Sequence, residues 1–160
     1  HKFAQVTVLS DEILESWGFS SIARQGGVNP IALCEAAMIP MALMAVHAGL
    51  SQRGVLFFVD NSVSLFSCVK GTSNEAHVAR SAQLAALVNF TTASRTWFEF
   101  MDSKSNWADG ISRLLAHDKF CLKHQIPVSQ VYIEPYWWQA HVHAVYQSIQ
   151  PYIAGATLDI

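Results

Sequence analysis

Three acidic residues occupy positions from which they could do chemistry together: Glu35, Asp60 and Asp109. Ligands in open α/β sheets gather at the carboxyl ends of strands. Asp60 directly follows a strand-like run, so we expect the three carboxyl groups to meet at one end of a sheet. Such a cluster favours Mg²⁺, which takes oxygen ligands and usually binds together with phosphate oxygens. Because like charges in one site repel, we also expect a neighbouring carboxylate to raise the pKa of at least one acid.

Each acid also has a purely structural explanation. Glu35 could pair with a neighbouring base, and Asp60 could cap the helix that follows it. Asp109, three residues after Asn106, could be a first-turn acid that interacts with a helix dipole. The residues alone leave these alternatives open.

The elements that would position the acids can be predicted from periodicity and caps. Residues 54–59 (GVLFFV) form a continuous apolar run, which indicates a strand buried on both faces. Asn61 or Ser62 then caps a helix that ends at Gly71. Further strands are predicted at residues 3–9 and 95–100, and further helices at residues 10–17, 30–49, 74–90 and 106–115.

Several helix starts carry a recognisable N-cap residue. The predicted N-caps are Ser10, Asn29, Asn74 and Asn106. Pro30 suits the first helical position, whereas Pro40 should kink the same helix one turn beyond Glu35.

Strands that alternate with helices in this order predict an α/β fold with parallel strand pairs covered by helices. After about residue 117 the pattern changes to an aromatic-rich segment, with one further helix expected over residues 135–151. We therefore divide the chain into a domain at residues 1–116 and a C-terminal helical extension at residues 117–160.

Composition narrows the class of protein. The chain has 160 residues, 51% of them hydrophobic, and a net charge of -2, so no global positive field draws it to nucleic acid or to an anionic membrane. Its three cysteines form no CxxC pair, which argues against a disulfide scaffold and a zinc ribbon and favours a reducing compartment. We expect an intracellular protein, either cytoplasmic or nuclear.

The apolar segment at residues 31–50 requires a test for membrane insertion. It contains Glu35, Pro40 and His47, which make it a poor membrane span because a carboxylate is costly inside a bilayer. We expect a buried helix and no membrane partner. The chain also starts with His and directly in strand-like sequence, so we interpret it as a fragment of a longer polypeptide.

Three motifs in order resemble the ribonuclease H-like domain of retroelement polyproteins, particularly those of reverse-transcribing mobile elements. They are FFVDN at residues 57–61, KGTS at residues 70–73 and SKSNWADGISR at residues 103–113. In that family a strand ends in Asp-Asn, the last helix opens with Asn-x-Ala-Asp followed by Ser-Arg, and the first long helix supplies an acid. The resemblance covers about residues 3–115, and the matching residues are Glu35, Asp60, Asn61, Asn106, Ala108, Asp109, Ser112 and Arg113.

The resemblance implies a mixed sheet flanked by helices and a two-metal nuclease site. Glu35, Asp60 and Asp109 would be the catalytic and metal-binding residues, with Mg²⁺ or Mn²⁺ as cofactor. In the complete domain one ion would activate water and the other would stabilise the leaving oxygen, which hydrolyses the RNA strand of an RNA–DNA hybrid.

The resemblance also implies partners. The substrate would be an RNA–DNA hybrid or another nucleic acid. Proteins recognise A-form helices mainly through contacts with the backbone. The residues expected to bind it are Asn61, Lys70, Lys104 and Arg113. The remainder of a larger polyprotein is the other expected partner.

Two departures from the family pattern affect these expectations. Met101, Asp102 and Ser103 replace the Val-Pro-Ser that precedes the last motif in family members. The family's first catalytic Asp lies on the opening strand, and no residue before Glu35 matches it. We therefore expect a domain that lacks its opening strand and is inactive by itself, with residues 3–9 as an exposed edge. The alternative is a non-catalytic module of the same fold that positions nucleic acid or binds protein.

Overall fold

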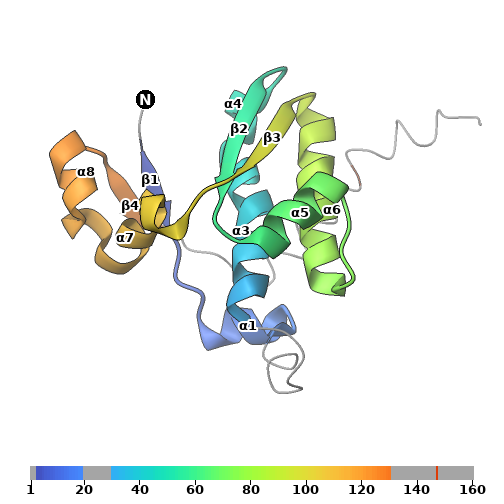
Figure 1. Ribbon diagram of the computed structural model, residues 1–160, viewed down its shortest axis with the longest axis horizontal. Helices are drawn as coiled ribbons and strands as arrows, with labels where there is room; N and C mark the ends of the chain where they lie inside the picture. Colours follow the sequence, from blue (N-terminus) through green and yellow to red (C-terminus); the bar gives the residue numbers. More distant parts are fainter. Residues whose placement is uncertain (1–2, 20–29, 131–146, 148–160) are drawn as a thin grey trace, which may run out of the picture.

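The computed structural model describes residues 3–19, 30–130 and 147. Two long helices, α3 (Pro30–Ala45) and α6 (Ala76–Thr92), pack side by side at the centre of the fold (Figure 1). Both hydrophobic clusters of the core include residues from each of these helices. The fold is therefore mixed α/β, with the helices α3 and α6 as its scaffold.

One sheet consists of β2 (Gly54–Val59) and β3 (Arg95–Phe100), which pair in parallel with Leu56 opposite Trp97. Both strands have the predicted bounds. The expectation that residues 54–59 are buried on both faces is wrong, because exposure alternates along the strand. Phe57 packs with Phe98 against the core, whereas Leu56 faces outward. Among the described residues, helices cover only one face of this pair.

A second parallel pair lies away from the central helices (Figure 1). β1 (Ala4–Val6) is shorter than predicted and pairs with β4 (Val128–Gln130), with Ala4 opposite Val128. The strand at the start of the chain is thus not a neighbour of β2, as a single sheet would require. Its partner comes from beyond residue 116, so this pair joins the two segments into which the sequence was divided.

The short helices between β3 and β4 complete this part of the fold. They are η1 (Ser103–Ser105), α7 (Trp107–Leu114), η2 (Leu115–His117) and α8 (Lys119–His124). The sequence predicted α7 and its N-cap Asn106, but not α8 or β4. The helix expected over residues 135–151 lies outside the described residues, apart from Gln147, which is helical.

Two of the remaining helices, α1 (Asp11–Ser16) and α5 (Ser62–Lys70), begin and end close to their predicted bounds. The single helix predicted over residues 30–49 is divided, because α3 ends at Ala45 and α4 (His47–Leu50) follows it. Ser10 caps α1 as expected, by accepting a hydrogen bond from the Ile13 N–H. The prediction for Asn74 is wrong, because Glu75 is the N-cap of α6 and makes no side-chain capping bond. Asn29 lies outside the described residues.

Pro40 lies inside α3, which continues to Ala45 despite the missing N–H donor. Pro40 is fully buried, so packing against the core holds the helix together where local propensity would end it. A separate short helix, α4, then leads to β2. In the described part of the chain, no helix is both long and apolar enough to span a membrane.

Candidate functional site

The first contact of the site joins α3 to the start of α5. Asn61 caps α5 by accepting a hydrogen bond of 3.0 Å at its Oδ1 from the Ser64 N–H. This capping bond fixes the amide, whose Nδ2 donates to Glu35 Oε2 over 2.6 Å. Glu35 lies one turn into α3 and is half-buried. The side chain that caps one helix therefore also holds the carboxylate of another.

The second contact joins the end of β2 to the start of α7 in the same way. Asn106 caps α7 by accepting a bond of 3.0 Å from the Ala108 N–H, and its Nδ2 donates to Asp60 Oδ2 over 2.7 Å. Asp60 therefore does not cap the following helix, because Asn61 takes that role. Two carboxylates, two capping asparagines and four elements (α3, α5, β2 and α7) therefore meet at the carboxyl end of β2.

The charges of this site act on Glu35. Burial raises the pKa of its carboxyl group, and the hydrogen bond from Asn61 lowers it. The negative charges of Asp60 and Asp109 raise the pKa further. This confirms the expectation that a neighbouring carboxylate raises the pKa of one acid, and it places Glu35 within electrostatic reach of the other two.

Asp109 is held less firmly than the other two acids. Its Oδ2 lies 3.8 Å from Nη2 of Arg113, one turn along α7, and the two side chains are 46% and 77% exposed. An exposed ion pair at this spacing contributes only about 0.3 to 0.5 kcal/mol. Arg113 therefore lies beside a candidate catalytic acid, where its guanidinium partly neutralises that acid.

The three acids do not form a closed metal centre in this arrangement. Their oxygen donors suit Mg²⁺ chemically. Across the part of the chain that the structure describes, however, no three His, Cys, Asp or Glu side chains are gathered closely enough to hold a metal ion. The amide N–H groups of Asn61 and Asn106 occupy oxygens of Glu35 and Asp60 instead. The described residues therefore do not complete a metal site by themselves.

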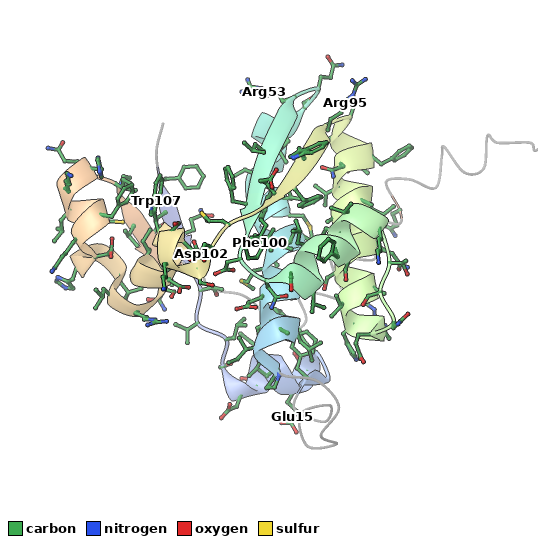
Figure 2. The ribbon with its side chains drawn as sticks, viewed as in Figure 1. Glu15, Arg53, Arg95, Phe100, Asp102 and Trp107 are labelled. Atoms are coloured by element: carbon green, nitrogen blue, oxygen red, sulfur yellow. The ribbon has the colours of Figure 1, made fainter. Side chains whose placement is uncertain are left out.

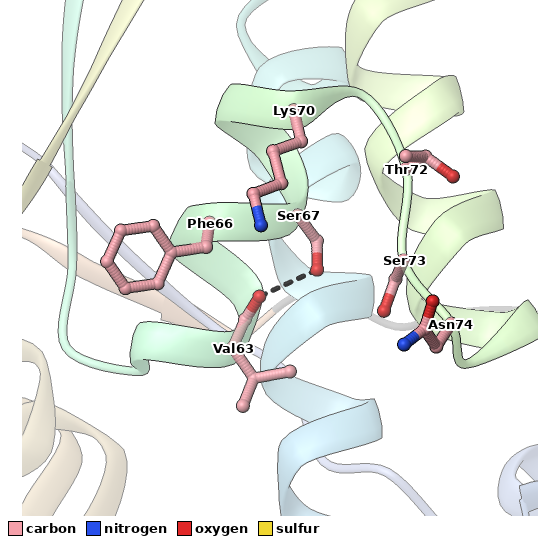
Figure 3. Close-up of a pocket in the computed structure, with 7 residues that line it drawn as sticks. All are labelled: Val63, Phe66, Ser67, Lys70, Thr72, Ser73 and Asn74. Carbon is pink, nitrogen blue, oxygen red and sulfur yellow. Dashed lines mark hydrogen bonds between the residues drawn. The ribbon is translucent and has the colours of Figure 1, made fainter.

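Lys70 lies at the opposite end of α5 from Asn61, beside a pocket of about 410 Å³ (Figure 3). The pocket is lined by Val63, Phe66, Ser67, Lys70, Thr72, Ser73 and Asn74. Lys104 belongs to η1, between β3 and α7, and is exposed. Of the four residues expected to bind nucleic acid, Asn61 and Arg113 thus contact the acids directly, whereas Lys70 lies apart from them.

Sequence reasoning missed Asn106 as the partner of Asp60, although it identified Asn106 as a cap. The available signal was the capping role itself. An asparagine that caps a helix with its amide oxygen keeps its N–H₂ group free to donate to a carboxylate. It also missed the neighbouring aromatic stack. The ring centroids of Trp107 and Phe120 are 4.3 Å apart, and Phe120 also contacts the ring of His124.

Comparisons of this chain with protein-family models, with curated proteins and with solved structures found no match.

Proposed function

We propose that this chain is a ribonuclease H-like domain derived from a retroelement polyprotein, and that the complete parent protein hydrolyses the RNA strand of RNA–DNA hybrids. One observation carries the proposal. The amides of Asn61 and Asn106 hold Glu35 of α3 and Asp60 at the carboxyl end of β2, where the charges of Asp60 and of Asp109 on α7 both act on Glu35. These are the positions at which the motifs of the chain resemble those of that family.

The proposal requires groups beyond the described residues. Two-metal hydrolysis with Mg²⁺ or Mn²⁺ needs carboxylates shared between the ions, and the resemblance assigns the shared one to an opening strand. We therefore assign the missing carboxylate to another segment of the parent polyprotein. We propose that this polyprotein is intracellular.

Substrate binding would rest on local cations rather than on net charge. The chain carries a net charge of -2, so a polyanion must be held by particular side chains. The side chain of Lys70 is exposed and extends its ammonium group toward Phe66 and Ser67, and Thr72 and Ser73 line the other side of the same pocket (Figure 3). We assign this pocket to a backbone phosphate of the hybrid.

A second candidate function is a non-catalytic module of the same fold that positions nucleic acid or binds protein. The observation that favours it is the pairing of Glu35 and Asp60 with asparagine amides, which gives one oxygen of each carboxylate a hydrogen-bond donor without a cation. Such a module would keep the geometry of the acids and lose the reaction.

Cleavage assays separate the two candidates. The isolated 160 residues should not cleave an RNA–DNA hybrid with Mg²⁺ or Mn²⁺. The chain extended by an upstream strand with a central Asp should cleave it, and Asp60→Asn should abolish that cleavage. Cleavage that survives Asp60→Asn would rule out the mechanism. A folded extended chain that does not cleave would establish the non-catalytic module.

Binding to the hybrid is measured separately, by fluorescence anisotropy at several salt concentrations without metal. Loss of one phosphate contact should reduce the slope of log K against log salt by about 0.9. Lys70→Ala should show this change, whereas Lys123→Ala on α8 is the matched control and should not. Equal slopes for the two variants would remove Lys70 from the binding surface.

A further inference from the structure

The outer face of the β2–β3 pair is apolar and exposed. Leu56, Phe58 and Trp97 are 58%, 49% and 68% exposed, and they lie on the face opposite the core. Among the described residues, no strand lies along the free edge of β3 or of β2. An unprotected edge beside an apolar face is a template for strand pairing.

The backbone of β3 presents a definite set of hydrogen-bonding groups at this edge. The Arg95 N–H donates to the C=O of Arg53, directly before β2, and the Met101 N–H donates to the C=O of Val59 at the end of β2. Since the bonding direction alternates along a strand, Thr96, Phe98 and Phe100 point their N–H and C=O groups to the free edge. The Phe100 N–H bonds only the Glu99 carboxylate of its own chain there, over 3.3 Å.

The side chains of β3 are arranged symmetrically around Trp97. Arg95 and Glu99 stand two residues before and after it, and all three point to the exposed face. Figure 2 shows Arg95 at one end of the strand and Phe100 at the other. If two β3 strands pair antiparallel with Trp97 opposite Trp97, each Arg95 lies opposite a Glu99 of the other copy.

We propose that β3 pairs antiparallel with β3 of a second copy of this chain, centred on Trp97, so that the two copies share a four-stranded sheet. This register agrees with the backbone, because Thr96 and Phe98 of opposite copies form the hydrogen-bonded pairs. Trp97 then falls in a non-hydrogen-bonded pair, where side chains approach most closely. Opposite charges and aromatic pairs are both favourable at such positions.

Charge complementarity selects β3 rather than β2 and fixes the register. β2 (GVLFFV) has no charged residue, so its edge offers no such complementarity. Centring the pair on Phe98 instead would leave Glu99 opposite Trp97 and Arg95 opposite Met101. Only the register centred on Trp97 pairs both charges of each copy.

Analytical ultracentrifugation of the 160-residue chain over a range of concentrations tests the proposal. The wild-type chain should form dimers. Glu99→Lys and Arg95→Glu should each weaken dimerisation about tenfold or more, because two attractive pairs become repulsive. Both residues are exposed, so circular dichroism should show an unchanged fold.

Mixing the two variants provides a control that a folding defect cannot imitate. The Lys introduced at position 99 of one chain faces the Glu introduced at position 95 of the other, and the remaining Arg95 faces Glu99. The mixture should therefore form heterodimers as tightly as wild type forms homodimers. A wild-type chain that stays monomeric, or a dimer that neither substitution weakens, would overturn the proposal.

Cross-linking tests the register directly. In a non-hydrogen-bonded pair the Cα atoms are about 4.5 Å apart, which a disulfide can bridge. Trp97→Cys should form a cross-linked dimer on mild oxidation, whereas Leu56→Cys, its neighbour on β2, should not. Equal cross-linking at both positions would show that another surface holds the copies together.

Discussion

At the scale of single residues, the site is built from carboxylates held by amides. Asn61 and Asn106 each use one end of the amide to cap a helix and the other to bond an acid. These two bonds bring Glu35 and Asp60 to one place although both are negative. The raised pKa of Glu35 shows that the folded state bears a cost for this arrangement.

The raised pKa predicts how Glu35 affects stability. The folded state binds the proton of Glu35 more tightly than the unfolded state does. The stability that this group contributes is therefore present below the ordinary Glu pKa of 4.5 and is lost as pH rises through the raised value. Glu35→Gln, which can still accept from Asn61, should raise the free energy of unfolding at about pH 7 and leave it nearly unchanged at about pH 4.

Urea unfolding at the two pH values measures this effect. Because water screens a half-exposed carboxylate, we expect a gain of less than about 1 kcal/mol at neutral pH. Glu15→Gln, on the exposed surface of α1, controls for the removal of one negative charge. A gain from Glu35→Gln that is equally large in acid would contradict the electrostatic explanation.

Asn61 allows the capping bond and the carboxylate bond to be separated. Asn61→Asp keeps an oxygen for the Ser64 N–H but turns a second carboxylate towards Glu35. Loss of a bond to a charged group, with repulsion in its place, should destabilise the fold by about 1 to 3 kcal/mol at neutral pH. Protonation restores a donor, so the loss should shrink in acid. Thermal unfolding at neutral and acid pH measures the effect, with Asn74→Asp at an exposed position as the control. If Asn61→Asp lost the same stability at both pH values, the contact with Glu35 would be unimportant.

At the scale of elements, α7 and α8 meet at a glycine. A Cβ added to Gly110 would lie 2.5 Å from Oδ2 of Asp118. Asp118 is buried and caps α8, because its Oδ1 accepts from the N–H groups of Phe120 and Cys121. The close approach of the two helices therefore depends on the absence of a side chain at position 110.

This contact reverses the usual effect of replacing a helical glycine. Gly to Ala in a helix normally stabilises by about 0.5 to 1 kcal/mol. Gly110→Ala should instead destabilise by about 1 to 2 kcal/mol, because displacing Asp118 breaks the cap of α8. Gly49→Ala in α4, with nothing within 4 Å, is the matched control and should not destabilise. Calorimetry that finds the two variants equally stable would contradict this account of the α7–α8 contact.

The elements show which features the sequence could reveal. The bounds of β2 and β3 follow from local composition and were predicted to the residue. The exposure of Leu56 was not predictable, because it depends on which elements cover the sheet rather than on the strand itself. Likewise Asn74 is a good capping residue, yet α6 begins after Glu75. Local preference favours Asn74 as the cap, but the helix begins one residue later and its N-cap makes no side-chain capping bond.

At the scale of the whole molecule, the contacts that sequence reasoning missed are those between distant segments. Asp60 and Asn106 are 46 residues apart, and β1 pairs with β4 across almost the whole described chain. The acids of the site could be named in advance because each has a recognisable local setting. Their bonds to asparagine could not be predicted, because each bond joins residues far apart in the sequence and only the folded structure brings those residues together.

The same view shows an uneven distribution of burial. Both core clusters draw on α3 and α6, so these helices form one cooperative unit. α7 has no buried residue, and α8 buries only Cys121. Since buried apolar contacts resist local opening, the α7–α8 part should open at a lower free energy than the core. The bond from Asn106 to Asp60 lies at the junction of the two parts.

Hydrogen exchange followed by mass spectrometry tests this difference and the role of the junction. Amides of α7 and α8 should exchange faster than those of α3 and α6. Asn106→Ser keeps a capping oxygen but lacks the amide donor to Asp60, whereas Asn106→Ala lacks both. If the bond to Asp60 restrains the opening, both variants should speed exchange in α7, and α6 should be unaffected. If only the cap matters, Asn106→Ser will exchange like wild type, and the junction would then have no part in holding Asp60 beside α7.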